Sequence, residues 1–217
     1  MTIIDAAPTN HREELRQHVR NKIVPLQNGY LNNRSDVVAS LARLRRGVHT
    51  LPGSDPSIWT ETLKDLPPEK YKGDNPTAME QAVHAALCLY AIHQQGRRTE
   101  PMHQSGRTHS FGHATRSLGT SIGAEDAVRR RFEALATASS FEETLHHARG
   151  LVTQLRAAKI PLDYGQFALD LEDLQKPSRA DAVRLRWGRD YYSYTKKEAG
   201  PSTDETPRPG TTTGEDQ

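Results

Sequence analysis

Arginine dominates the basic chemistry of this chain of 217 residues. Its 29 basic residues comprise 21 arginines and 8 lysines. A guanidinium group presents a rigid fork of N–H donors that matches the oxygens of a phosphate, so arginine is typical of phosphate recognition. A GC-rich genome produces the same excess of arginine, and the ratio alone therefore leaves that alternative open.

The arginines gather in two segments. Residues 97–131 hold seven arginines against three acids, a net charge of +4, and residues 34–46 hold four arginines against one acid. Clustered arginines are the electrostatic footprint of proteins that bind a nucleic-acid backbone. The candidate nucleic-acid-binding residues are Arg34, Arg43, Arg45, Arg46, Arg97, Arg98, Arg107, Arg116, Arg129, Arg130 and Arg131.

The small net charge of the chain conceals this pattern. The formal net charge is +2, but residues 196–217 contribute three bases and five acids, so the rest of the chain carries +4. Acids also cluster: residues 55–81 hold six acids and three bases, and residues 163–175 hold four acids and no base. Near-neutrality therefore does not exclude a nucleic-acid partner.

Two interpretations of the basic clusters stay open. Arg45 and Arg46 end a predicted helix before Gly47, where cations stabilise the negative helix terminus without any ligand. The functional interpretation is that such arginines extend toward phosphates. Only 13 residues are aromatic, which argues against a base-stacking surface and favours backbone contact without sequence reading. The alternative is a helical scaffold whose charged surfaces serve only subunit–subunit assembly.

Residues with catalytic or metal-binding potential form no recognisable constellation. His109 and His113 have the i,i+4 spacing of helical zinc ligands, but no Glu of the HExxH kind lies between them and no third ligand follows. The chain has a single cysteine, Cys88, and it contains neither a GxSxG motif nor a glycine-rich phosphate loop. We therefore predict no enzymatic activity, no metal, no cofactor and no small-molecule substrate.

The apolar residues recur with helical spacing throughout, which predicts an all-α fold. We expect two packed helical bundles, residues 9–96 and 111–195, joined by a basic linker or loop at 97–110 and followed by a disordered tail at 196–217. The first expected helix begins at residue 9 or 10 and includes residue 23. Further helices are expected at 35–47, 55–66, 77–95, 110–119, 124–138, 141–159, 163–175 and 179–194.

The same spacing assigns side chains to faces. Leu15, Val19 and Ile23 recur every four residues and predict the buried face of the first helix. Asp170 and Asp173 are expected on a polar face, opposite the apolar face of their helix. Further side chains are expected to face inward or to lie in the core: Ile58, Trp59, Leu63, Trp187 and Tyr191.

No stretch of the sequence is apolar for long enough to cross a membrane, and the first residues lack the charged and apolar regions of a secretory signal. We therefore expect a cytoplasmic protein with no membrane partner. The lone cysteine agrees with a reducing compartment.

Four motifs in order resemble the CasB family, the small subunit of the type I-E CRISPR Cascade surveillance complex: ASLARLRRG, PMHQSGRTHSFGHATRSLG, IPLDYGQFALDLEDLQ and VRLRWGRDYY. The resemblance covers residues 10–194 and implies a non-catalytic, all-α subunit of two helical halves. It implies guide RNA, target DNA, the other Cascade subunits and a second copy of the chain as partners, and a role in stabilising the R-loop in antiviral defence. Arg45, Arg46, Arg107 and Arg116 lie within the matching motifs, whereas Arg129, Arg130 and Arg131 lie between them and rest on charge alone.

Overall fold

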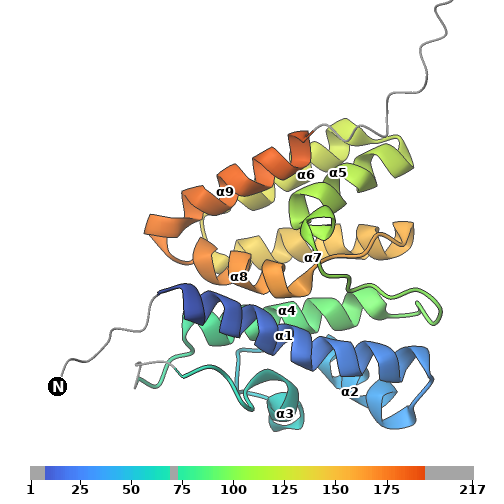
Figure 1. Cartoon of the computed structure of the whole chain (residues 1–217), viewed down its shortest axis with the longest axis vertical. Helices are drawn as coiled ribbons and strands as arrows, with labels where there is room; N and C mark the ends of the chain where they lie inside the picture. Colours follow the sequence, from blue (N-terminus) through green and yellow to red (C-terminus); the bar gives the residue numbers. More distant parts are fainter. Residues whose placement is uncertain (1–7, 69–72, 194–217) are drawn as a thin grey trace, which may run out of the picture.

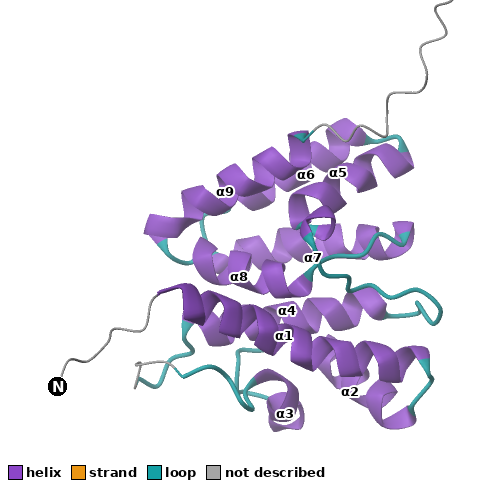
Figure 2. Cartoon of the chain, viewed as in Figure 1, coloured by secondary structure: helices purple, strands orange, loops and turns teal. Residues whose placement is uncertain are grey.

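Helices account for nearly all of the regular structure in residues 8–68 and 73–193, the part of the chain that the computed structural model describes. Within those ranges there is no strand, and the single β-bridge joins His103 to Leu162. The α-helices are α1 (Pro8–Leu31), α2 (Ser35–Gly47), α3 (Trp59–Thr62), α4 (Ala78–Gln94), α5 (Phe111–Ile122), α6 (Glu125–Ala136), α7 (Phe141–Ala158), α8 (Tyr164–Leu174) and α9 (Pro177–Tyr192), with 3₁₀ turns at Pro56–Ile58 and Arg107–His109. The predicted all-α class is confirmed (Figure 2).

Local capping signals set most helix ends. Thr77 accepts a hydrogen bond from the backbone N–H of Glu80 at 3.2 Å, and the Glu80 carboxylate accepts one from the backbone N–H of Thr77 at 2.7 Å, which forms a capping box at the start of α4. Gly123 ends α5 with φ of 60°, as a C-terminal glycine commonly does. Gly47 is the last residue of α2, and a side chain does not fit at this position, because a Cβ would lie 2.8 Å from Ile58 Cδ1.

α4 lies at the centre of the molecule and packs against α1, α2, α7 and α8. Nearly every residue of α4 is buried, whichever way it points, so the helix has no solvent face along most of its length. In Figure 1, α1 lies in front of α4, α8 lies in front of α7, and α9 lies in front of α6. The molecule therefore presents a front face built by α1, α8 and α9 and a back face that includes α7.

One continuous hydrophobic core runs through both halves of the chain. It extends from Leu15 in α1 to Tyr191 in α9, and α4 and α1 both contact α8 directly. Residues 97–110 also take part in the packing, since Met102 and His103 are buried. The division into bundles 9–96 and 111–195 stays a prediction, and the predicted tail, 196–217, lies outside the described residues.

Most of the predicted core faces are confirmed. Leu15, Val19 and Ile23 are fully buried, and Trp187 and Tyr191 pack with Phe132 in an aromatic cluster. The inward placement of Trp59 is wrong. Its side chain is 46% exposed and its indole N–H donates to the Gly53 carbonyl at 2.8 Å. The reason is that α3 is only one turn long, so the face expected for a longer helix does not persist.

The expectation of a polar face for Asp170 and Asp173 is also wrong. Both carboxylates are buried, with 1% and 3% of their surface exposed, because basic residues on other segments cover them. Arg186 of α9 donates to Asp170 at 2.6 Å, and Arg12 of α1 pairs with Asp173. Burial raises the pKa of Asp170, and the neighbouring Arg186 opposes that shift.

Two glycines in helices test the packing. A Cβ on Gly112 of α5 would lie 2.5 Å from the Trp187 carbonyl oxygen in α9, whereas nothing lies within 4 Å of a Cβ on Gly150 of α7. We expect Gly112→Ala to lower the free energy of unfolding by about 1–3 kcal/mol through overpacking. Gly150→Ala should raise it by about 0.5–1 kcal/mol through helix propensity. Urea denaturation measures both, and a Gly112→Ala protein as stable as the wild type would contradict the α5–α9 packing.

A buried histidine predicts loss of stability in acid. His93 is fully buried, and burial lowers its pKa to about 3. Below pH of about 6.5 the unfolded chain binds a proton at this position that the folded chain does not, so stability falls as the pH falls. Between about pH 7 and pH 5 this one group should cost about 2 kcal/mol.

Urea denaturation at the two pH values checks the pH effect. His93→Gln should lose correspondingly less stability in acid than the wild type, because the group that titrates on unfolding is gone. His146→Gln, at an exposed position of α7, should keep the pH dependence of the wild type. An unaltered pH dependence in His93→Gln would count against the assignment.

Candidate nucleic-acid interface

Four arginines line a shallow hollow of about 540 Å³ where the end of α2 meets α7. Arg45 and Arg46 come from α2, and Arg149 and Arg156 come from α7. We call this hollow the α2–α7 groove. The other lining residues are Ala42, Ile92, Gln95 and Thr153, so no carboxylate lies among the residues that form it.

The arginines of the α2–α7 groove lie close enough to affect one another, and no acid lines the groove itself. Arg156 donates to the Gln95 side chain at 3.0 Å, and Nη1 of Arg45 is buried without a hydrogen-bond partner. Burial lowers the pKa of Arg45, and the positive charges of Arg46 and Arg156 lower it further. Like charges gathered without a counter-ion repel one another, and a bound anion relieves that repulsion.

The sequence predicts two of the four arginines of this groove. Arg45 and Arg46 were among the candidates, whereas Arg149 and Arg156 were not. The missed pair does have a signal in the sequence, because residues seven apart on a helix share a face. Only the tertiary structure, in which α2 and α7 both pack on α4, shows that this face continues the cluster.

Several other predicted arginines contact their own chain. Arg34 pairs with Asp36 at 2.6 Å, and Arg43 donates to the Ser57 carbonyl at 3.1 Å. Arg129 pairs with both neighbouring acids of its helix, at 3.1 and 2.9 Å. Such exposed ion pairs contribute about 0–1 kcal/mol each, so they do not prevent these arginines from binding a phosphate instead.

The arginines of residues 97–131 lie in separate places. Arg97 donates to the carbonyls of Arg156 and Ala157 at the end of α7, at 2.8 and 3.1 Å. Arg98 lies over the Tyr30 ring, 4.6 Å from its centroid. Arg116 donates to the Tyr191 carbonyl at 3.4 Å. The segment is therefore one cluster in sequence but not in space.

Arg130 and Arg131 are exposed on α6, which packs against α7. Within the described residues neither side chain makes a hydrogen bond or an ion pair. They remain candidates for binding a partner.

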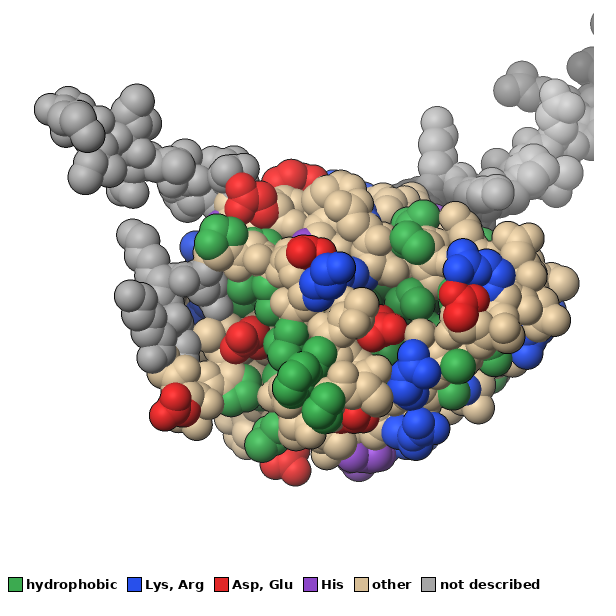
Figure 3. Space-filling model, turned by 90° about the horizontal axis from the view of Figure 1, so that it is seen from below, with side chains coloured by type: hydrophobic (Ala, Val, Ile, Leu, Met, Phe, Trp, Pro, Cys, Tyr) green, Lys and Arg blue, Asp and Glu red, His purple; other side chains and the backbone are tan. Residues whose placement is uncertain are grey.

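Positive charge is also mixed with negative charge on the side of the molecule that carries α2 and α3. Figure 3 shows that face from below, with Lys and Arg side chains in small groups among acidic and apolar ones. No continuous basic stripe crosses the described part of that face.

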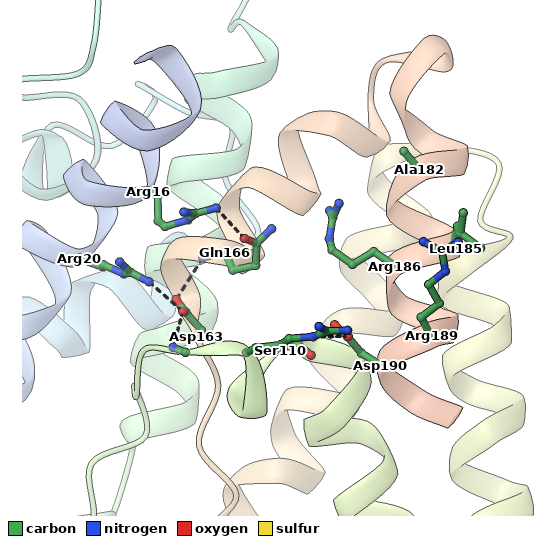
Figure 4. A pocket seen from close by; sticks show the side chains of 12 residues that line it. Arg16, Arg20, Ser110, Asp163, Gln166, Ala182, Leu185, Arg186, Arg189 and Asp190 are labelled. Atoms are coloured by element: carbon green, nitrogen blue, oxygen red, sulfur yellow. Dashed lines mark hydrogen bonds and ion pairs between the residues drawn. The ribbon is translucent and has the colours of Figure 1, made fainter. Parts of the chain in front are cut away.

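Arg107 lies on the front face, in a second groove between α1 and α9. Figure 4 shows arginines of both helices around this groove. We call it the α1–α9 groove. The α2–α7 groove is built instead on α7, which lies behind α8 in Figure 1, so the predicted arginines are divided between two faces.

His113, one of the two histidines considered as zinc ligands, contacts two hydroxyl groups. In His113, Nδ1 lies 2.8 Å from the Ser110 hydroxyl and Nε2 lies 2.9 Å from the Ser193 hydroxyl. Across residues 8–68 and 73–193, no group of three or more His, Cys, Asp or Glu is placed to hold a metal ion. Cys88 is buried, which raises the pKa of its thiol and keeps it protonated.

A family model described as CRISPR-associated protein Cse2 matches residues 40–192, more than half of the chain. The chain belongs to the Cse2 family. This confirms the resemblance seen in the sequence motifs. None of the curated proteins matches the chain in sequence.

Solved structures agree with the Cse2 assignment. CasB from Thermobifida fusca is 37% identical, with a TM-score of 0.69, and the match covers 83% of this chain and 98% of that one. A Cse2-family protein from Thermus thermophilus is 23% identical with a TM-score of 0.57, over 83% and 97% of the two chains. CasB from M. ruber is 19% identical with a TM-score of 0.54, over 71% and 83%. The last two likenesses show the fold alone.

Among the described helices of this Cse2-family chain, none combines the length and apolar character that a membrane-spanning segment needs.

The structure separates arginines that stabilise the fold from arginines that do not. Arg97 caps the carbonyl end of α7, so we expect Arg97→Ala to lower the free energy of unfolding by about 1–2 kcal/mol. Arg46→Ala and Arg130→Ala should change it by less than about 0.5 kcal/mol, because both side chains are exposed. Thermal and urea denaturation of the three variants measure the difference. Equal losses in all three would contradict this separation.

Proposed function

We propose that this Cse2-family chain is a non-catalytic subunit of the type I-E CRISPR Cascade complex that binds nucleic-acid backbone through the α2–α7 groove. The single observation that carries the proposal is the gathering of four arginines from two helices with no carboxylate among the lining residues. A phosphodiester backbone supplies the anions that such a cluster lacks.

The chemistry of the groove suits backbone contact rather than base recognition. No aromatic side chain lines it, so it offers no surface on which bases stack. In RNA-guided recognition, base pairing reads the sequence, and protein contacts to the backbone tip a nearly balanced exchange of strands. We therefore propose that this subunit contacts guide RNA and target DNA and stabilises the R-loop in antiviral defence.

The proposed contacts begin with Arg45, Arg46, Arg149 and Arg156. Exposed Arg130 and Arg131 on α6 would extend the contact, since α6 packs against α7. Arg34, Arg43 and Arg129 form weak exposed interactions that a phosphate can replace. The other Cascade subunits and a second copy of the chain are proposed partners of the assembled complex.

A scaffold role without nucleic-acid contact is the second candidate. It is favoured by the many arginines that already pair with acids of the same chain, such as Arg20 with Asp163 and Arg186 with Asp170. Those pairs lie outside the α2–α7 groove, however, and a scaffold gives no reason for a cluster without acids.

The salt dependence of DNA binding tests the proposal. Arg46→Ala combined with Arg149→Ala removes two phosphate contacts, so the slope of log binding constant against log salt should fall by about 1.4–1.8. Affinity should drop about equally for all target sequences, because backbone contacts carry no sequence information. The measurement uses the assembled complex and fully matched target DNA over a salt series.

A charge-matched variant provides the control. Lys64→Ala combined with Arg184→Ala also removes two positive charges, but neither residue lines the α2–α7 groove. It should leave the salt slope unchanged. If the groove variant assembles and binds target with the wild-type slope, the proposed interface is wrong and the scaffold role is favoured.

A further inference from the structure

The α1–α9 groove is a half-open cavity of about 600 Å³ on the front face of the molecule. α1 contributes Arg16 and Arg20, α9 contributes Arg186 and Arg189, and the 3₁₀ turn after Gly106 contributes Arg107. Figure 4 shows these walls, with the start of α8 between them. The groove shares no residue with the α2–α7 groove.

The charge of the α1–α9 groove is nearly balanced, although arginines dominate its lining. Four of its five arginines pair with carboxylates of the same chain, which leaves one positive charge in excess. The pairs are Arg16–Glu13, Arg20–Asp163, Arg107–Asp190 and Arg186–Asp170. In the described part of the chain Arg189 has no hydrogen-bond or ion-pair partner.

Two of these arginines are accessible to a ligand. Arg107 is 78% exposed, and its contact with buried Asp190 is long, at 3.3 Å. Arg189 is exposed one turn beyond Leu185 on α9. The groove therefore offers two guanidinium groups that can bind external carboxylates without breaking a strong ion pair.

An apolar ledge adjoins these arginines. Leu185 lines the groove and is 54% exposed, and exposed Ala182 lies nearly one turn before it. Figure 4 shows Leu185 beside Arg189 on the same wall. A phosphate backbone gains nothing from an exposed leucine, whereas an apolar side chain of a polypeptide gains free energy by covering it.

The floor of the groove is pre-organised. Asp163 caps α8 by accepting from the backbone N–H of Gln166 at 3.1 Å, and it also accepts from the backbone N–H of Gly106 and from Arg20, each at 2.9 Å. Gly165 lets α1 approach closely, since a Cβ there would lie 3.0 Å from Arg20 Nε. A rigid site loses less entropy when a ligand binds.

We infer that the α1–α9 groove docks an acidic segment of a protein partner. Two carboxylates of that segment bind Arg107 and Arg189, and an apolar side chain between them packs on Leu185 and Ala182. A single excess charge is too little for a phosphate track, and the apolar ledge selects a polypeptide. The inference does not rest on the proposed nucleic-acid contact, because the two grooves lie on different helices.

A short acidic peptide tests the inference on the full chain. The probe is a fluorescent acetylated peptide of sequence Glu-Asp-Leu-Ile-Asp-Glu, measured by anisotropy at low salt, and its site is mapped by the backbone amide NMR shifts of Gly106 and Leu185. We expect saturable binding that Arg107→Ala with Arg189→Ala weakens about tenfold through loss of two charge pairs. Leu185→Ser should weaken it to a similar extent, about tenfold, through lost apolar contact.

Matched controls decide the outcome. Arg46→Ala with Arg149→Ala, which removes two arginines from the other groove, should leave peptide binding unchanged. The inference is overturned if the peptide fails to bind, binds all variants equally, or shifts amides outside the groove. It is also overturned if a thymidine strand of about 12 nucleotides displaces the peptide, which would make this a phosphate site. The salt-slope experiment on the α2–α7 groove uses other variants, so either proposal can fail alone.

Discussion

The burial of carboxylates on α8 and at its N-terminus is the constraint on which the rest of the structure depends. Asp170 and Asp173 lie in the interior with almost no exposed surface, and Asp163 is buried at the helix N-terminus. A buried carboxylate is costly unless a cation and further hydrogen bonds compensate it. α1 and α9 supply those cations, so both helices must pack against α8 in one register. The hydrophobic core is non-directional and does not by itself impose that register.

This requirement sorts the arginines into two kinds. Arg20 and Arg186 are committed to buried carboxylates, and removing either would leave an unpaired buried charge. Arg45, Arg46 and Arg149 form no ion pair in the described part of the chain, and no acid lines the groove that they share, so their charge remains available to a ligand. The functional signal in this molecule is therefore the local absence of carboxylates rather than the local number of arginines. The α1–α9 groove shows the difference, since it has more arginines than the α2–α7 groove but a smaller excess of charge.

Much of the fold could be predicted because the signals that define it are local. Helical spacing and helix-starting residues act within a few residues, and the expected range 77–95 lies within one residue of α4 at each end, whereas the expected range 110–119 stops three residues before the end of α5. The prediction for Trp59 failed because a one-turn helix has no periodicity to follow. The prediction for Asp170 failed because helical spacing identifies a polar face but not what covers it. Half of the α2–α7 groove was missed for the same reason.

The sequence by itself determined the all-α class, most helix bounds, the buried face of α1 and membership of the Cse2 family. These depend on residue order over short distances and on motifs that keep their order. Only the tertiary structure decided which arginines are neutralised, because the partners are far apart along the chain: Arg20 and Asp163 are 143 residues apart, and Arg12 and Asp173 are 161 apart. Electrostatic interaction depends on distance in space and on burial, and neither follows from position in the chain.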